Sequence, residues 1–115
     1  MVAKEPPMSI QLPKSIDAYL VSENSNDLEA LAGCFTADGI VRDEGRTMEG
    51  LASIKEWKVA SKKKYQYTVE PIDAIEKDGK TVVTVRVAGT FPGSPVNLRY
   101  VFGLDGDKIA SLEIR

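Results

Sequence analysis

The sequence predicts an α+β fold, with helices concentrated in the first half of the chain and a largely antiparallel sheet in the second. Apolar residues recur at helical spacing up to about residue 65 and alternate with polar residues after it. Asp-Gly pairs at 78–79 and 105–106 interrupt the alternating segments, and Asp-Gly favours the tight turns of β-hairpins. We therefore expect three helices packed on one face of a curved sheet.

The chain divides into a short arm and one domain. Residues 1–13 contain three prolines and little hydrophobic periodicity, so we expect a flexible N-terminal arm there. Residues 14–115 are long enough to bury a single core without disulfides or metals, and they contain no visible repeat.

The first helix is predicted from Lys14 to Glu23, because Ile16, Tyr19 and Leu20 lie on one face at this spacing. Glu23 falls close to the same face. A tyrosine on such a face usually belongs to the core, with its hydroxyl reaching a polar partner. A role for Tyr19 in a functional site would depend on an acid lying across a pocket from it.

The clearest helix begins after Asn26, which resembles an N-cap, with Glu29 three residues later as in a capping box. Its apolar positions follow the spacing i, i+3, i+4 and i+7, at Leu28, Leu31, Ala32 and Phe35. The helix is expected to end near Asp38-Gly39, where glycine can take a left-handed conformation.

A first strand is predicted over residues 40–44, and it carries the acid of greatest interest. Strand alternation places Val41 and Asp43 on one face, beneath the helices. Two hypotheses follow for Asp43. It is either a residue that leads the chain into the turn at Glu44-Gly45, or a carboxyl group whose burial raises its pKa and suits it to proton transfer.

A third helix is predicted over residues 50–64. Its core-facing residues are Leu51, Ile54 and Trp57. Its lysines, Lys55, Lys58 and Lys62 to Lys64, are expected to be exposed near its C-terminal end, where they complement the helix dipole. The remaining residues, from Tyr65 onward, are predicted to form four strands joined by turns at 77–80, 91–95 and 105–107.

Composition excludes several kinds of chemistry. The chain contains no histidine, so Ser-His-Asp and Cys-His nucleophiles and histidine bases are ruled out, and the commonest metal ligand is missing. With 15 basic and 17 acidic residues, the chain lacks the charge of a nucleic-acid-binding protein. No nucleotide or metal motif occurs, so we expect no cofactor and no metal.

The location expected from the sequence is the cytoplasm. The single cysteine, Cys34, cannot form an internal disulfide and fits a reduced compartment as a small core residue. No segment approaches the ~20 apolar residues of a transmembrane helix, and no signal peptide is visible at the start. We expect no membrane partner.

The order of these elements resembles the nuclear transport factor 2-like superfamily. The residues that carry the resemblance are Tyr19, Asn26-Asp27-Leu28, Phe35-Thr36-Ala37-Asp38-Gly39-Ile40-Val41, Gly50, Ile54 and Trp57. The chain is most similar to the SnoaL-like group, which includes polyketide cyclases and is related to ketosteroid isomerases. The resemblance covers about residues 14–115, and it implies a conical, cystatin-like α+β roll with a pocket between the helices and the concave face of the sheet. It also implies a homodimer packed through the outer face of the sheet.

The resemblance also suggests roles for two residues. Ketosteroid isomerases carry a tyrosine on the first helix and an aspartate at the end of the first strand, and Tyr19 and Asp43 occupy the matching positions. In that family the aspartate shuttles a proton and the tyrosine hydrogen-bonds the developing enolate oxygen. A second oxyanion donor there is an acid on the penultimate strand, where this chain has Leu98.

Two functions are therefore open. The first is an isomerase, cyclase or dehydratase of a small apolar cyclic carbonyl compound, with Asp43 as proton shuttle and Tyr19, together with Tyr100, as oxyanion donors. The second is a non-catalytic homodimer that binds a small ligand or a protein. Under either hypothesis the expected pocket lining is mostly apolar: Phe35, Val41, Trp57, Leu98, Tyr100, Phe102 and Leu112.

Overall fold

The computed structural model describes residues 11–115, which form three helices and a six-stranded sheet. In chain order the elements are α1 (Lys14–Ser25), α2 (Leu28–Gly33), β1 (Phe35–Asp43), β2 (Arg46–Glu49), α3 (Leu51–Tyr65), β3 (Thr68–Lys77), β4 (Lys80–Ala88), β5 (Val96–Asp105) and β6 (Lys108–Ile114). Most of the predicted arm, residues 1–10, lies outside the described residues. Within the rest of it, Leu12 packs against the core and Pro13 precedes α1.

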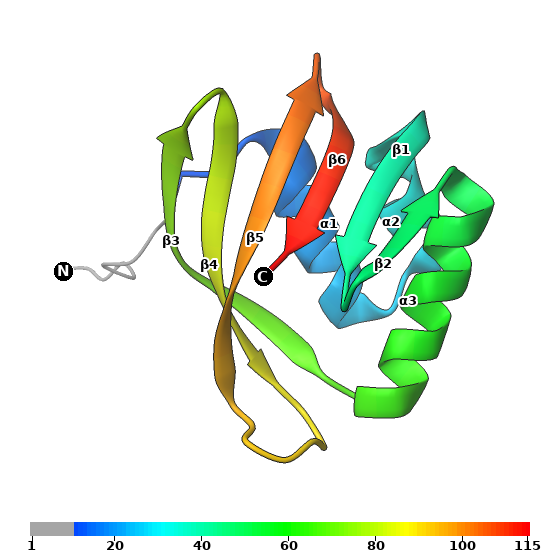
Figure 1. Ribbon diagram of the computed structural model, residues 1–115, viewed down its shortest axis with the longest axis vertical. Helices are drawn as coiled ribbons and strands as arrows, with labels where there is room; N and C mark the ends of the chain where they lie inside the picture. Colours follow the sequence, from blue (N-terminus) through cyan, green and yellow to red (C-terminus); the bar gives the residue numbers. More distant parts are fainter. Residues whose placement is uncertain (1–10) are drawn as a thin grey trace, which may run out of the picture.

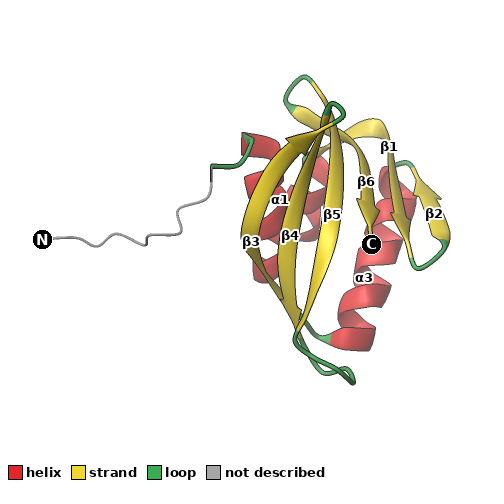
Figure 2. Ribbon diagram, turned by 60° about the vertical axis from the view of Figure 1, so that its left-hand side comes forward, coloured by secondary structure: helices red, strands yellow, loops and turns green. Residues whose placement is uncertain are grey.

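The strand order is β2-β1-β6-β5-β4-β3 (Figure 1). Every neighbouring pair is antiparallel except β1 and β6, which run parallel. The sheet is strongly curved, and all three helices lie on one side of it (Figure 2). The predicted cystatin-like α+β roll, with helices on one face of a mainly antiparallel sheet, is confirmed.

The core fills the space between the helices and the inner face of the sheet. Alternate residues of the strands point into it, as the buried Val83, Val85 and Val87 of β4 do. Phe102 and Leu112 face each other across β5 and β6 and are almost completely buried. This single apolar layer supplies most of the stabilisation expected of a domain of this size.

The second helix is shorter than predicted, and this is the main correction to the expected elements. Helix α2 ends at Gly33, and residues from Phe35 onward belong to β1. Phe35 pairs with Ile109, and a register shift follows before Ile40 rejoins the ladder. The phenylalanine is buried in either conformation, so helical spacing could not reveal that β6 recruits this segment as a strand.

The junction between the first two helices also differs from the prediction. Asn26 does not cap the second helix, because it takes a left-handed conformation (φ 56°) at the end of α1. Asp27 is the N-cap of α2 instead, and its side chain accepts a hydrogen bond from the Ala30 amide. Tyr65 likewise ends α3 rather than beginning a strand.

Candidate functional site

A cavity of about 390 Å³ lies between the inner face of the sheet and α3. It is lined by Asp43, Glu44, Trp57, Ser61, Tyr65, Tyr67, Val87, Phe91, Pro92, Val96, Leu98, Tyr100 and Ile114. The volume is within the range of small-molecule pockets, and most of the lining side chains are apolar or aromatic. The cavity has the size and character of a binding site for a small organic molecule.

One face of α3 supplies a wall of this cavity. Trp57, Ser61 and Tyr65 are four residues apart in succession, so they lie one above another on the same side of the helix. Val87 of β4, Val96 and Leu98 of β5, and the loop between these strands line another side of the cavity. From this loop Phe91 packs edge-on against Tyr65 at 5.7 Å between ring centroids.

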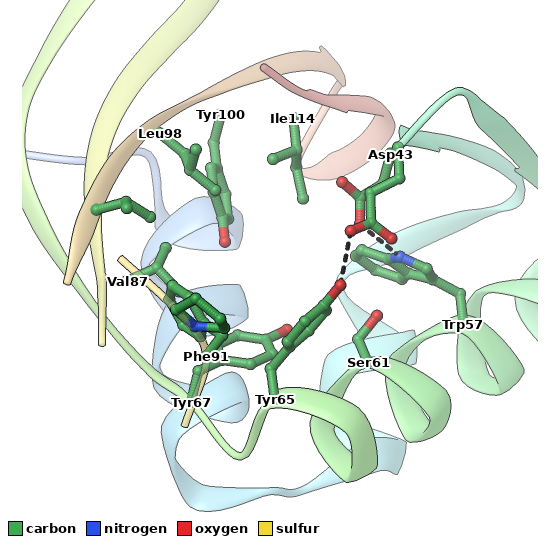
Figure 3. Close-up of a pocket in the computed structure, with 13 residues that line it drawn as sticks. Asp43, Trp57, Ser61, Tyr65, Tyr67, Val87, Phe91, Leu98, Tyr100 and Ile114 are labelled. Atoms are coloured by element: carbon green, nitrogen blue, oxygen red, sulfur yellow. Dashed lines mark hydrogen bonds between the residues drawn. The ribbon is translucent and has the colours of Figure 1, made fainter. Parts of the chain in front are cut away.

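Asp43 is the last residue of β1, and its carboxylate faces the cavity (Figure 3). The indole nitrogen Nε1 of Trp57 donates a hydrogen bond of 3.0 Å to its Oδ2. Burial raises the pKa of the Asp43 carboxyl above its usual value, and the hydrogen bond from Trp57 opposes this shift. Asp43 is therefore a half-buried carboxyl group held in one orientation at the edge of an apolar space.

Three tyrosines bring hydroxyl groups to the same cavity. The hydroxyls of Tyr67 and Tyr100 point toward its interior, as does the carboxylate of Asp43 (Figure 3). The Tyr65 hydroxyl is engaged at the side of the cavity, where it donates a 2.9 Å hydrogen bond to Glu44. Burial raises the pKa of Tyr67 and of Tyr100, so both remain neutral hydrogen-bond donors at physiological pH.

The residues predicted from sequence divide into two groups. Four line the cavity: Asp43, Trp57, Leu98 and Tyr100. Five lie in the close-packed core and not on the cavity wall: Tyr19, Phe35, Val41, Phe102 and Leu112. The sequence identifies the inner face correctly, but it cannot show where along that face the helices stand away from the sheet.

Tyr19 lies in the core rather than across the cavity from Asp43. Its ring packs edge-on against Phe35 and Phe102, at 5.8 Å between centroids in both cases. Among residues 11–115, no group forms a hydrogen bond with the Tyr19 hydroxyl. Burial, reinforced by the nearby Glu23 carboxylate, raises the pKa of Tyr19 well above its usual range.

A buried ion pair that was not predicted from the sequence lies behind the cavity. Lys58 was expected at the surface, yet it is 3% exposed, and its Nζ lies 3.0 Å from Oε2 of Glu23, which is 1% exposed. The spacing of Glu23 after Ile16 and Tyr19, and of Lys58 after Ile54, places both charges on apolar helix faces. An acid and a lysine that both occupy core-facing helical positions are the sequence signal from which this ion pair could have been predicted.

The described residues contain no group of three or more His, Cys, Asp or Glu side chains arranged to hold a metal ion. No helix within residues 11–115 is long and apolar enough to cross a membrane.

Comparisons with known proteins identify the family and close structural relatives. The family model of the SnoaL-like domain matches residues 16–112. A protein from Sinorhizobium meliloti, provisionally named a polyketide cyclase, has a solved crystal structure and shares 39% sequence identity with this chain. The two structures superpose with a TM-score of 0.87, and the match covers 90% of this chain and 95% of the other. No curated protein matches the chain.

Two further solved structures share the fold. The epoxide hydrolase/cyclase-like enzyme SalBIII, which takes part in pyran ring formation in the polyether salinomycin, is 25% identical, with a TM-score of 0.74 and coverage of 88% and 86% of the two chains. A hypothetical protein with a ketosteroid isomerase-like fold from Catenulispora acidiphila, in complex with trimethylamine, is 21% identical, with a TM-score of 0.79 and coverage of 91% and 86%.

Proposed function

The chain belongs to the SnoaL-like family, and we propose that it is an isomerase, cyclase or dehydratase acting on a small, largely apolar cyclic carbonyl compound. The observation that carries this proposal is the half-buried carboxyl group of Asp43 at the edge of a 390 Å³ cavity lined mainly by apolar and aromatic side chains. A carboxyl group with a raised pKa is suited to take a proton from a carbon beside a carbonyl and return it.

In this mechanism Asp43 removes an α-proton of the bound carbonyl compound, and the carbonyl oxygen becomes an enolate. Neutral hydroxyl donors stabilise that developing charge better than they stabilise the ground-state carbonyl, which lowers the barrier. The hydroxyls of Tyr67 and Tyr100 are the donors nearest to this task, because both point into the cavity. Tyr19 is too deeply packed to contact a ligand there and supports the core behind them.

The test is exchange of α-protons for deuterium. The protein is incubated in D₂O with small cyclic ketones such as 2-indanone, and loss of the α-proton signals is followed by NMR. We expect the unmodified protein to exchange the α-protons faster than the same concentration of the Asp43→Asn variant does. Exchange at the buffer rate for every ketone tried would reject the proposal of proton transfer.

A second candidate function, ligand binding without turnover, is favoured by the charge of the cavity. Among residues 11–115, five aromatic side chains and two carboxylates line it, and no lysine or arginine does. Aromatic faces and carboxylates together attract ammonium groups, so an amine is the ligand such a non-catalytic domain would hold. Calorimetric titration with trimethylammonium separates the two functions: saturable binding without any α-proton exchange supports the second.

We also propose that the protein forms a homodimer through the outer face of the sheet. Ile75, Val82 and Val101 are neighbours in one row across β3, β4 and β5 on this face, and Ile75 is 56% exposed. An apolar row on an otherwise polar face is a suitable centre for a symmetric interface. Light scattering at micromolar concentration should give twice the chain mass, and Val82→Glu should give the monomer mass. A monomer before any substitution would reject this interface.

A further inference from the structure

The proposed mechanism leaves an electrostatic problem that the cavity lining does not solve. An enolate would form beside Asp43 and Glu44, in a space where none of the lining residues that the structure describes is positively charged. A hydroxyl that itself accepts a hydrogen bond from an ammonium is polarised, and it is a stronger donor to an oxyanion than a hydroxyl without such a partner. A positive charge one residue away from the cavity would resolve this difficulty.

Lys58 supplies such a charge. Its Nζ donates a 2.5 Å hydrogen bond to the hydroxyl oxygen of Tyr67, and Tyr67 lines the cavity. The ammonium is held in place by the Glu23 carboxylate at 3.0 Å and lies 4.0 Å from the centroid of the Trp57 ring. It is closed off from solvent and is not itself among the residues that line the cavity.

The direction of these hydrogen bonds decides whether the Tyr67 hydroxyl proton can be donated into the cavity. The hydroxyl oxygen of Tyr67 accepts from Lys58, so its own proton remains to be donated. The Glu23 carboxylate competes for that proton, because its charge and its capacity to accept a hydrogen bond from Tyr67 both raise the pKa of Tyr67. The same carboxylate is held in an ion pair with Lys58 at 3.0 Å.

We propose that Lys58, anchored by Glu23, is a positioning residue that makes the Tyr67 hydroxyl the principal oxyanion donor of the cavity. The ammonium polarises the hydroxyl and prevents Glu23 from capturing its proton. This role rests on the proposed proton-transfer function. It assigns a purpose to an ion pair whose burial is otherwise costly, since removing two charges from water is compensated only by well-formed partners.

The experiment measures the preference of the cavity for an oxyanion, not turnover. Binding of 4-nitrophenolate is compared with binding of 4-nitrotoluene, a neutral molecule of the same shape, by calorimetry at one pH. All measurements use the Asp43→Asn background, because a neutral residue there reproduces the site after proton transfer. The ratio of the two affinities reports how far the site stabilises an oxyanion, by charge and by hydrogen bonding, relative to a neutral methyl group.

We expect Tyr67→Phe to reduce this ratio about tenfold, and Glu23→Gln with Lys58→Met to reduce it by a similar factor. Adding Tyr67→Phe to the latter pair should cause no further loss, because Lys58 acts through Tyr67. Glu29→Gln with Lys55→Met, which removes an exposed ion pair between α2 and α3 whose residues do not line the cavity, is the matched control and should leave the ratio unchanged.

An unchanged ratio in the Glu23→Gln/Lys58→Met protein overturns the inference, as does an additive loss with Tyr67→Phe. Failure of 4-nitrophenolate to bind preferentially in the parent background also overturns it. Ketone α-proton exchange by the unmodified protein is measured separately, so either hypothesis can fail while the other stands. If the Glu23→Gln/Lys58→Met protein does not fold, the ¹⁵N NMR signal of Lys58 Nζ in the Asp43→Asn protein is measured instead. This signal should shift when 4-nitrophenolate binds and should not shift when 4-nitrotoluene binds. The absence of a shift with 4-nitrophenolate overturns the inference.

Discussion

Asp43→Asn is expected to reduce α-proton exchange of a cyclic ketone by about 10²- to 10⁴-fold, the usual contribution of a general base. The amide keeps an oxygen that can accept the hydrogen bond from Trp57, so the cavity should keep its shape. The rate is measured by NMR in D₂O. Asp73→Asn, an exposed aspartate facing away from the cavity on β3, is the matched control and should retain the full rate.

The same substitution should stabilise the fold at neutral pH. Burial raises the pKa of Asp43 in the folded state, so the folded protein binds the proton more tightly than the unfolded chain. Stability therefore falls as pH rises from the usual aspartate pKa through the raised one. Thermal unfolding should show a higher Tm for Asp43→Asn above this window and no difference below it. A lower Tm at neutral pH would contradict burial as the dominant cause of the shift.

Lys58→Met is expected to cost about 3–5 kcal/mol of unfolding free energy, because it leaves the Glu23 carboxylate buried without its partner. Combining it with Glu23→Gln should recover most of that loss, since burying an uncharged pair of similar volume costs far less than burying one unpaired charge. Urea denaturation of the two single variants and the double variant gives the coupling between the two residues directly.

The control for this cycle is a second ion pair that begins on the same helix. Lys55 contacts Glu29 at 3.0 Å, but the Glu29 side chain is 80% exposed. Lys55→Met should change the unfolding free energy by less than about 1 kcal/mol, as is usual for surface pairs. If Lys58→Met were equally mild, Lys58 would be neutral or solvated in the folded protein, and its role behind Tyr67 would lose its basis.

Asp43 and Lys58 are both charged groups placed where charge is unfavourable, one at the cavity edge and one behind its wall. Burial lowers the pKa of Lys58, while Glu23 acts against this shift. Desolvated charged groups concentrate at functional positions, so Asp43 and Lys58 both mark this part of the described fold as a candidate site.

Local patterns were sufficient for the fold class and for the position of Asp43. Strand alternation from Val41 placed the Asp43 side chain on the inner face, and the Asp-Gly pair at 78–79 fixed the β3–β4 hairpin, where both residues have positive φ. These are properties of near neighbours in the chain, so the sequence contains them directly.

Pairing between distant segments determined the rest. Helical spacing extended the second helix to Phe35, whereas β6 takes that residue into the sheet through Ile109. Tyr19 was expected to face Asp43, but the packing of α1 encloses it between Phe35 and Phe102. Such outcomes depend on competition between long-range contacts, which a local window does not register.

By itself the sequence determined an α+β roll with an acid under its helices, because periodicity and turn chemistry are local. Only the tertiary structure decided which side chains meet around that acid. It opened the cavity along Trp57 and Tyr65 instead of beside Tyr19, and it buried Lys58 against Glu23. The physical reason is that a cavity and a buried ion pair are set by how closely α1 and α3 approach a curved sheet, and that distance is a property of the whole core.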